Sequence, residues 1–394
     1  MGKISSRLSR IKPSPTLTIT QKAQELKARG IDVISFSAGE PDFDTPPHIV
    51  DAAVRAMREG ITRYTAVAGL PALREAVAAQ SRRVRGAPCE AKQVIVTSGA
   101  KHALYGFFHA VLNPGDEVVV PAPYWVSYPD QVLLAGGEPR IVETRAEDGW
   151  VLTPKALEGA VTPRTVAVVI NTPSNPTGGL YSREAIEAIT RRAVELKLWI
   201  VADEIYRDLI YDGLSHVSPL SVAEREPERV FVVDGVSKTY AMTGWRIGWG
   251  IGDPDVIAAM SKIQGQETSN ASSMCQAAAL AAIEAPADFL DGWRAEYSAR
   301  RDVMVAGLNR MPGVTCRKPQ GAFYVLPDVR QICARMGGAA TDVEIATYLL
   351  EEGRVATVPG SAFGAPGYVR LSYATSMRDI EEGLGRMAAA FAKL

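Results

Sequence analysis

Lys238 stands in a segment suited to covalent chemistry, VSKTYAMTGWRIG (236–248). It follows the apolar run from Val230 to Val233, which predicts a buried strand, and Arg246 is the next charged residue along the chain. An amine that is partly desolvated and close to another cation has a lowered pKa, which makes it a nucleophile toward carbonyl compounds. A lysine that extends from a strand end into solvent fits the same segment, so the segment alone leaves both interpretations open.

Asp203 ends a second predicted strand, in the segment IVADEIYRDL (200–209). A carboxylate without a partner is costly at the end of so apolar a strand, so we expect Asp203 to have a cationic partner. A buried carboxylate that faces a pyridine-type nitrogen would keep that nitrogen protonated and make the ring an electron sink. The alternative is that Asp203 caps a helix over 204–210 and that Tyr206 serves only in packing.

Asn175 lies in INTPSNPTGG (170–179), where a predicted strand enters two proline turns and a glycine pair. Ligands of open α/β sheets bind at the carboxyl ends of parallel strands, and an amide donor there suits a phenolate or carboxylate oxygen. The alternative is an asparagine that only stabilises a turn. Asn175, Asp203 and Lys238 follow one another at intervals of 28 and 35 residues, each at the end of a strand predicted for one sheet.

A phosphate-binding turn is indicated by VTSGAKHAL (96–104), where Ser98, Gly99 and Ala100 join a predicted strand to a helix. Free N–H groups at the start of a helix bind phosphate, and a glycine lets the ligand approach the backbone. A plain tight turn is the alternative for this motif. Further candidates for phosphate contact are Ser237 and Arg246.

The elements that must position these residues alternate between helices and apolar strands. Helices are predicted over 47–59, 71–85, 100–112 and 182–196. Strands are predicted at QVIVTSG, EVVVPA, RIVE, TVAVVIN, LWIVAD and RVFVVDG. This alternation predicts an α/β fold with a doubly wound, mainly parallel sheet that is buried on both faces.

Two smaller regions flank this α/β region. Before it, the pattern predicts a helix over 16–29 and a strand over 32–39. After it, a long helix over 287–309 precedes strands at GAFYVL, RVATVPG and YVRLSY and helices over 342–352 and 376–392, which is typical of an α+β domain. We therefore expect an N-terminal arm and part of the small domain over 1–45, a large domain over 46–289 and a small domain over 290–394.

Composition and charge exclude several classes of protein. Lys and Arg number 43 against 44 Asp and Glu, and this balance gives no electrostatic case for a nucleic-acid or anionic-membrane partner. The four cysteines and four histidines are scattered, so neither a disulfide framework nor a metal site is indicated. The sequence has no 18-residue apolar run and no apolar signal region at its start, so we expect a cytoplasmic protein without a membrane segment.

Taken in order, the motifs resemble those of the class I aminotransferases, which are pyridoxal-phosphate enzymes of fold type I, and in particular their bacterial aspartate and aspartate/prephenate branch. The similarity runs almost end to end, through SAGEPDFDTP, RYTAVAGLPALREA, SGAKHAL, PYWVSYP, NTPSNPTG, ADEIYRDL, SKTYAMTGWRIG, GAFYVL and RLSYATS. The resemblance implies a large domain with a mainly parallel seven-stranded sheet between helices and a smaller α+β domain. It also implies pyridoxal 5'-phosphate as the cofactor and a homodimer with shared active sites.

The same resemblance implies roles for single residues. Lys238 would form an aldimine with the cofactor and move the proton at the substrate Cα, while Asp203 would pair with the pyridine nitrogen. Asn175 and Tyr206 would hydrogen-bond the phenolic oxygen, and Trp125 would stack on the ring. The remaining cofactor-binding residues would be Gly99, Ala100, Lys101, Ser237, Arg246 and, reaching the phosphate of the neighbouring subunit, Tyr64.

For the substrate, the resemblance implies that Arg370 binds the α-carboxylate, with Gly39 closing over it. Trp125 and Asn175 would also contact the substrate. A second carboxylate needs a second cation, and no arginine occurs between Arg246 and Arg294. In the bacterial branch, Lys101 and Thr16 of KPSPT would take that role; the alternative for Lys101 is a solvated lysine in the first turn of a helix.

We therefore expect transfer of the amino group from aspartate to 2-oxoglutarate, giving oxaloacetate and glutamate by a ping-pong mechanism. A prephenate or aromatic amino acid aminotransferase would use the same residues, and a β-lyase could be built on the same scaffold. His102 replaces a glutamine found in other members, and its effect is left open.

Overall fold

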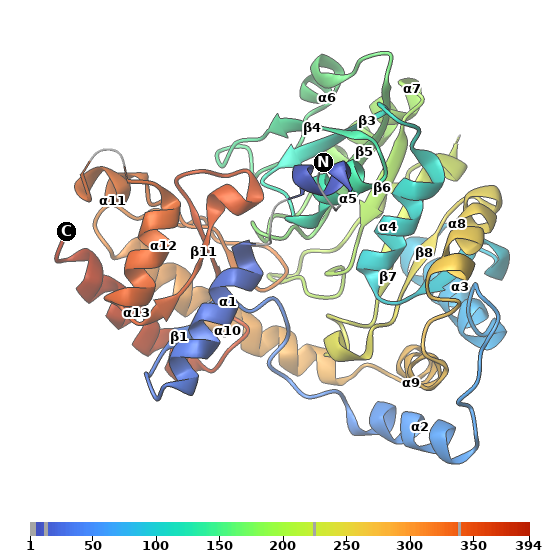
Figure 1. Ribbon diagram of the computed structural model, residues 1–394, viewed down its shortest axis with the longest axis horizontal. Coiled ribbons are helices and arrows are strands. Elements are labelled where there is room, and N and C mark those ends of the chain that lie inside the picture. The colour runs from blue at the N-terminus through green and yellow to red at the C-terminus, as the bar shows by residue number, and fades with distance from the viewer. Residues whose placement is uncertain (1–4, 12–14, 224–225, 338–339) are drawn as a thin grey trace.

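A seven-stranded sheet forms the centre of the protein, in a computed structural model that describes residues 5–11, 15–223, 226–337 and 340–394 (Figure 1). Its strands run in the order β2-β8-β7-β6-β5-β3-β4. They are β2 (Val94–Thr97), β3 (Glu117–Ala122), β4 (Glu138–Glu143), β5 (Thr165–Asn171), β6 (Trp199–Asp203), β7 (Val230–Gly235) and β8 (Gly248–Ile251). All pairs are parallel except those of β8, which is antiparallel to β2 and β7. The mainly parallel sheet confirms the predicted fold class.

Helices cover both faces of this sheet (Figure 1). One face packs on α4 (Ala100–Val111), α5 (Ser127–Leu134) and α8 (Pro254–Glu267). The other packs on α3 (Pro71–Arg85), α6 (Pro154–Ala160), α7 (Arg183–Glu195) and α9 (Ser273–Glu284), and α2 (Pro47–Arg58) lies against α9. Proline at the first turn of α2, α3 and α8 suits these helix starts, because the N–H that proline lacks has no partner there.

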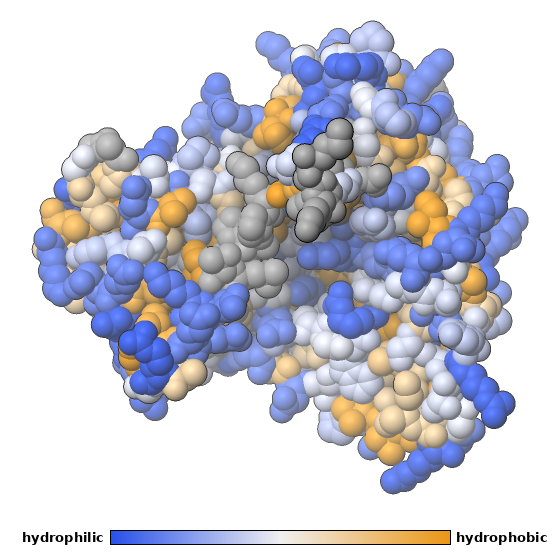
Figure 2. Space-filling view, in the orientation of Figure 1, coloured by the Kyte–Doolittle hydropathy of each residue, from blue (hydrophilic) through white to orange (hydrophobic). Residues whose placement is uncertain are grey.

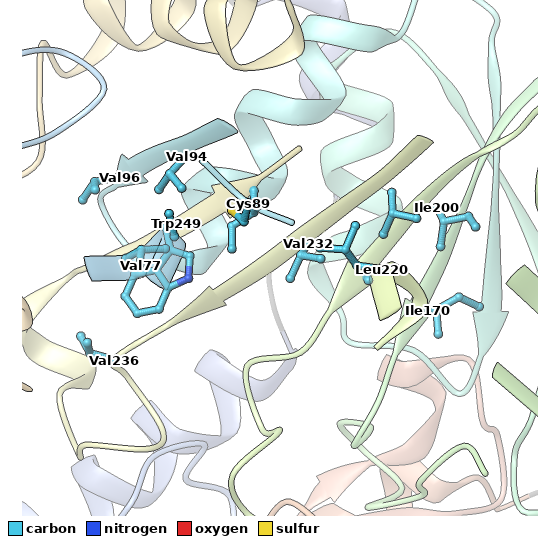
Figure 3. Packing of buried hydrophobic residues seen from close by; sticks show 14 of the residues in the cluster. Val77, Cys89, Val94, Val96, Ile170, Ile200, Leu220, Val232, Val236 and Trp249 are labelled. Atoms are coloured by element: carbon cyan, nitrogen blue, oxygen red, sulfur yellow. The ribbon is translucent and has the colours of Figure 1, made fainter. Parts of the chain in front are cut away.

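Alternate side chains of each central strand enter different cores, as a sheet buried on both faces requires. In β6, Ile200 and Ala202 belong to one apolar cluster and Val201 to the other. In β7, Val232 belongs to the first cluster, where Figure 3 shows it between Trp249 and Ile200, while Phe231 belongs to the second. Both sides of the sheet are thus closed to water, and its carboxyl edge is left to bind ligands.

A second, smaller α+β region surrounds a separate apolar cluster. Its helices are α1 (Pro15–Ala28), α10 (Phe289–Asn309), α11 (Arg330–Arg335), α12 (Asp342–Glu351) and α13 (Met377–Phe391). Its strands are β1 (Ile34–Ser35), β9 (Tyr324–Val325), β10 (Val355–Ala356), β11 (Val358–Pro359) and β12 (Val369–Ser372). The N-terminal β1 pairs with β10, which joins the two ends of the chain in one region. The domain boundaries given above stay predictions.

Several elements differ from the sequence prediction. The strand expected at RVATVPG is divided into β10 and β11, which belong to different sheets, and α5, α6, α8, α9 and α11 were not predicted. The strand expected over 32–39 is the two-residue β1, because the carbonyls of Ser37 and Gly39 beyond it accept hydrogen bonds from Arg370 and Lys238 instead of from a strand. The helix considered over 204–210 is replaced by turns. Strand β8 was not predicted, because its glycines favour no strand; they are needed where Ala100 and Phe231 pack closely against Gly248 and Gly250. Within the described ranges, no helix is both long enough and apolar enough to span a bilayer.

Candidate active site

A cavity of about 450 Å³ opens at the carboxyl ends of β5, β6 and β7. Most of the residues predicted for the site line it: Gly39, Ala100, Lys101, Trp125, Asn175, Asp203, Tyr206, Ser237, Lys238, Arg246 and Arg370. Residues from β12 and from the segment after β1 complete the wall, so both regions of the molecule contribute. The topology therefore brings together residues that lie more than 300 positions apart in the sequence, from Gly39 to Arg370.

Lys238 lies three residues beyond β7 and is only partly exposed, toward the cavity. Its Nζ donates a hydrogen bond to the Gly39 carbonyl at 2.5 Å and lies 5.9 Å from the Tyr206 ring centroid. Burial lowers the pKa of Lys238 from its ordinary 10.5 to about 8; Glu40 opposes this shift, and the cations Arg370 and Arg246 add to it. The amine thus has the desolvation and the neighbouring cation that the sequence suggested.

Asp203 ends β6 with only 5% of its surface exposed. Tyr128 Oη donates to its Oδ2 at 2.7 Å, and the Ile205 N–H donates to its Oδ1 at 3.3 Å. Burial raises the pKa of Asp203 to about 6, although these two hydrogen bonds lower it. The expected cationic partner is not found among the described residues, where Asp203 forms no ion pair with Lys, Arg or His. Tyr128 was missed in the sequence, although it stands in the motif PYWVSYP.

Arg370, on β12, is a buried cation with 2% of its surface exposed. Its Nη1 donates to Asn175 Oδ1 at 3.2 Å and its Nη2 to the Ser37 carbonyl at 2.8 Å. The guanidinium lies 4.6 Å from the Tyr324 ring centroid, while its buried Nε has no hydrogen-bond partner in the described chain. Burial lowers the pKa of Arg370. A cation in this setting suits an incoming carboxylate.

Tyr206 is buried beside these residues, and its hydroxyl lies 2.9 Å from that of Tyr324. Burial and the neighbouring Tyr324 hold the pKa of Tyr206 well above its usual range. Both phenols therefore stay protonated and can act as hydrogen-bond donors at neutral pH. Tyr324 was also missed in the sequence; the signal that could have found it is the motif GAFYVL.

The phosphate-binding turn lies where β2 passes into α4. Gly99 has a φ of 89°, and a side chain there would come within 2.6 Å of Arg246 Nη2, so only glycine fits. Arg246 donates to the carbonyls of Thr243 at 2.8 Å and Ser98 at 3.4 Å. The N–H groups of Ala100 and Lys101, at the start of α4, form no hydrogen bond with any described residue. Two free donors and an arginine thus line one cavity, which suits a phosphate.

The remaining predicted residues are less enclosed. The Lys101 ammonium is 4.8 Å from the Trp125 ring centroid, and burial, with a smaller effect of Arg246, lowers the pKa of Lys101. Thr16 lies in the first turn of α1, but its side chain falls outside the described residues, as do residues 12–14 of KPSPT. Tyr64 is 87% exposed and does not line the cavity of its own chain.

The cofactor implied by the sequence motifs fits these residues. A buried carboxylate without a cation at Asp203 suits a protonated ring nitrogen, and the free N–H groups of α4 suit a phosphate. Lys238 offers an amine with a lowered pKa in the same cavity. We therefore assign pyridoxal 5'-phosphate to this cavity as the group that these residues would hold.

Over almost its full length, the chain is similar to known proteins of one family. A family model described as aminotransferase class I and II matches residues 31–387. An aspartate aminotransferase of Geobacillus stearothermophilus is 48% identical over 388 residues, which are 98% of each chain. An aspartate/prephenate aminotransferase of Thermus thermophilus is 46% identical over 391 residues, again 98% of each chain.

The fold is also similar to solved structures of aspartate aminotransferases. The aspartate aminotransferase of Thermus thermophilus solved with maleate has a TM-score of 0.94 at 45% identity, covering 99% of this chain and 100% of its own. The aspartate aminotransferase of Rhizobium meliloti has a TM-score of 0.96 at 41% identity, covering 100% of both. These likenesses confirm the fold type I architecture implied by the sequence motifs.

Proposed function

Because the chain belongs to the class I and II aminotransferases, which use pyridoxal phosphate, we propose that it transfers the amino group of aspartate to 2-oxoglutarate. The products are oxaloacetate and glutamate, released one after the other in a ping-pong mechanism. The observation that carries this proposal is that Lys238, with a pKa lowered to about 8, and Arg370, with an unpaired buried Nε, face one cavity. A carboxylate bound by the arginine brings its α-carbon toward the amine.

Pyridoxal phosphate, when bound, supplies an electron-withdrawing ring that accepts the electron pair left when the Cα proton of the amino acid departs. Lys238 Nζ would take that proton from Cα and give it back in a 1,3-proton shift. A pKa of about 8 leaves about a tenth of the amine neutral, and so able to accept a proton, at pH 7. Asp203 would hold the ring nitrogen in its protonated form, and Tyr128 orients the Asp203 carboxylate by a hydrogen bond. These residues thus divide the work between moving the proton and keeping the ring electron-poor.

The other predicted residues would bind and orient. Asn175 and Tyr206 would donate to the phenolic oxygen, Trp125 would stack on the ring, and Gly39 would cover the α-carboxylate bound by Arg370. The phosphate would be contacted by the N–H groups of Ala100 and Lys101 and by Ser237 and Arg246, and Gly99 would leave room for it beside Arg246. Asn175 lines the cavity, and its Oδ1 accepts a hydrogen bond from Arg370. It is therefore placed to contact both the cofactor and the substrate carboxylate that Arg370 would bind.

Lys101 and Thr16 would recognise the second carboxylate of aspartate. The Lys101 ammonium lies over the Trp125 ring and, among the described side chains, forms no ion pair. It is therefore a cation at the cavity wall without a carboxylate of its own, which suits a dicarboxylic substrate. Thr16 enters the proposal through the sequence motif alone.

We also propose that the protein works as a homodimer in a reducing cytoplasm. Val50, Met57, Ile61 and Tyr64 are exposed on α2 and the loop that follows it, and Figure 2 shows apolar atoms over α2. A second subunit on this face would cover them and would bring Tyr64 to the phosphate of the neighbouring site. The compartment is supported by the four cysteines, which are all free thiols. Light scattering of the purified protein tests the dimer.

The substrate is tested by assaying the purified protein with aspartate and 2-oxoglutarate and measuring oxaloacetate. Because several relatives are aspartate/prephenate aminotransferases, prephenate and tyrosine belong in the same assay as a second candidate pair. Oxaloacetate formation at a kcat/KM far above that for tyrosine supports the proposal. Turnover of prephenate or tyrosine without turnover of aspartate contradicts it.

A further inference from the structure

His102, whose effect the sequence motifs left open, lies on α4 directly beside the phosphate-binding turn. Its Nδ1 accepts a hydrogen bond from the backbone N–H of Ser98 at 3.2 Å, and its Nε2 lies 3.0 Å from Glu267 Oε2. Because a backbone N–H can only donate, Nδ1 must be the unprotonated nitrogen, and Nε2 carries the proton donated to Glu267. The two bonds select one neutral tautomer and fix the orientation of the ring.

The hydrogen bonds around Ser98 decide which N–H groups the turn offers to a ligand. His102 occupies the Ser98 N–H, and Arg246 Nη2 donates to the Ser98 carbonyl at 3.4 Å. The Gly99 N–H donates to the Thr97 carbonyl at 2.7 Å. The turn is therefore held on both sides of Ser98, and its next two N–H groups, those of Ala100 and Lys101, are left for the phosphate.

Glu267 gives independent support for this arrangement. It is the last residue of α8, where a carboxylate meets the negative end of the helix dipole and is unfavourable without a partner. In the part of the chain that the structure describes, the neutral His102 ring is the one hydrogen-bond partner of its carboxylate. The contact thus ties the turn to a second helix, and the position of Glu267 is explained by that contact.

We propose that His102 is a positioning residue for the phosphate of the cofactor. It acts through Ser98, whose peptide it holds, and Glu267 holds His102 in the required tautomer. The inference rests on the proposed function and concerns the phosphate end of the cofactor alone, so the ring and its contacts with Asp203 and Lys238 are not affected.

Two variants of nearly equal size test the role of Nδ1. His102→Asn keeps an acceptor, Oδ1, at the place of Nδ1, whereas His102→Leu removes it. Each cofactor-free protein is titrated with pyridoxal phosphate and, separately, with pyridoxal, which lacks the phosphate. We expect the leucine variant to bind pyridoxal phosphate about tenfold more weakly than the wild type, and pyridoxal unchanged. The asparagine variant should stay within about twofold of the wild type for both ligands.

An equal loss for both ligands would overturn the proposal, because it would show a general distortion of the site. So would an unchanged affinity of the leucine variant for pyridoxal phosphate. Glu267→Met keeps the test decisive if the leucine variant does not fold, since this side chain is 39% exposed. The Glu267→Met variant should bind pyridoxal phosphate about threefold more weakly than the wild type and should bind pyridoxal equally well. Wild-type transamination of aspartate is measured separately, so the proposed function and the role of His102 can fail independently.

Discussion

Tyr128 Oη donates a hydrogen bond to Asp203 Oδ2 across 2.7 Å, and this bond stands where an ion pair was expected. A neutral donor offsets less of the desolvation of a carboxylate than a cation does, so burial still raises the pKa of Asp203 to about 6. The carboxylate therefore stays available to a cation that comes from outside the chain, such as a protonated ring nitrogen.

Asp203→Asn should stabilise the cofactor-free protein while removing activity. The pKa of Asp203 is raised from 3.8 to about 6, so its ionised form costs about 3 kcal/mol of stability above pH 6, and this cost disappears as the pH falls toward 3.8. Urea unfolding should therefore show a larger gain for the variant at pH 8 than at pH 5. An equal gain at both pH values would contradict this account.

Lys238 in the cofactor-free protein should react with an amine-labelling reagent at a rate that rises with pH, with a midpoint near 8. Only the neutral amine is a nucleophile, and the pKa of Lys238 is lowered to about 8, mainly by burial. Peptide mapping after brief labelling gives the rate at this one residue. Glu40→Gln should move the midpoint below 8, because Glu40 raises the pKa of Lys238. A midpoint near 10 in the wild type would show an ordinary, solvated lysine.

Lys101→Ser should raise the KM for aspartate by about tenfold or more, because the second carboxylate loses its cation. The KM for alanine, which has no second carboxylate, should change little. Steady-state kinetics with both amino acids provide the comparison. Similar losses for both would show that Lys101 supports the cofactor or the fold and does not select the substrate.

Arg85→Met should destabilise the protein by about 3–5 kcal/mol, since it leaves two buried carboxylates without their shared cation. Arg85 donates to Glu204 Oε2 and to Asp234 Oδ2, each at 2.8 Å, and all three side chains are buried. Arg83→Met, at an exposed position on the same helix, is the matched control. Denaturant unfolding measures both.

The same variant should change the response to acid. Although burial opposes it, Arg85 and His216 lower the pKa of Glu204 from 4.5 to about 2, so this stabilisation is present above pH 4.5 and is lost as the pH falls toward 2. The Arg85→Met protein should lose less stability than the wild type over that range. An equal loss of stability in both proteins would show that the ion pair of Arg85 and Glu204 does not govern acid unfolding.

The sequence predicts the sheet and most of the cavity wall because strand ends and turn residues are local signals. Asn175, Asp203 and Lys238 each follow a run of apolar residues, and parallel strands bring such ends to one edge. Tyr128 and Tyr324 carry no such signal, since a buried phenol in a motif looks like packing until its partner is known. Strand β8 was not predicted because its glycines are required by close contacts with Ala100 and Phe231. Only the folded chain brings these residues near β8.

The pairing of β2 with the antiparallel strand β8 links the phosphate-binding turn to the edge of the sheet. Thr97 of β2 pairs with Gly248 of β8, so the turn at Gly99 and the guanidinium of Arg246 meet only when these strands are paired. β2 forms the margin of the sheet and has β8 as its single neighbour there. A phosphate bound between the Gly99 turn and Arg246 would therefore stabilise the pairing of β2, the strand at this edge, with β8. We expect cofactor binding to slow amide hydrogen exchange in β2 far more than in the central β6, and local opening of this margin to govern cofactor loss.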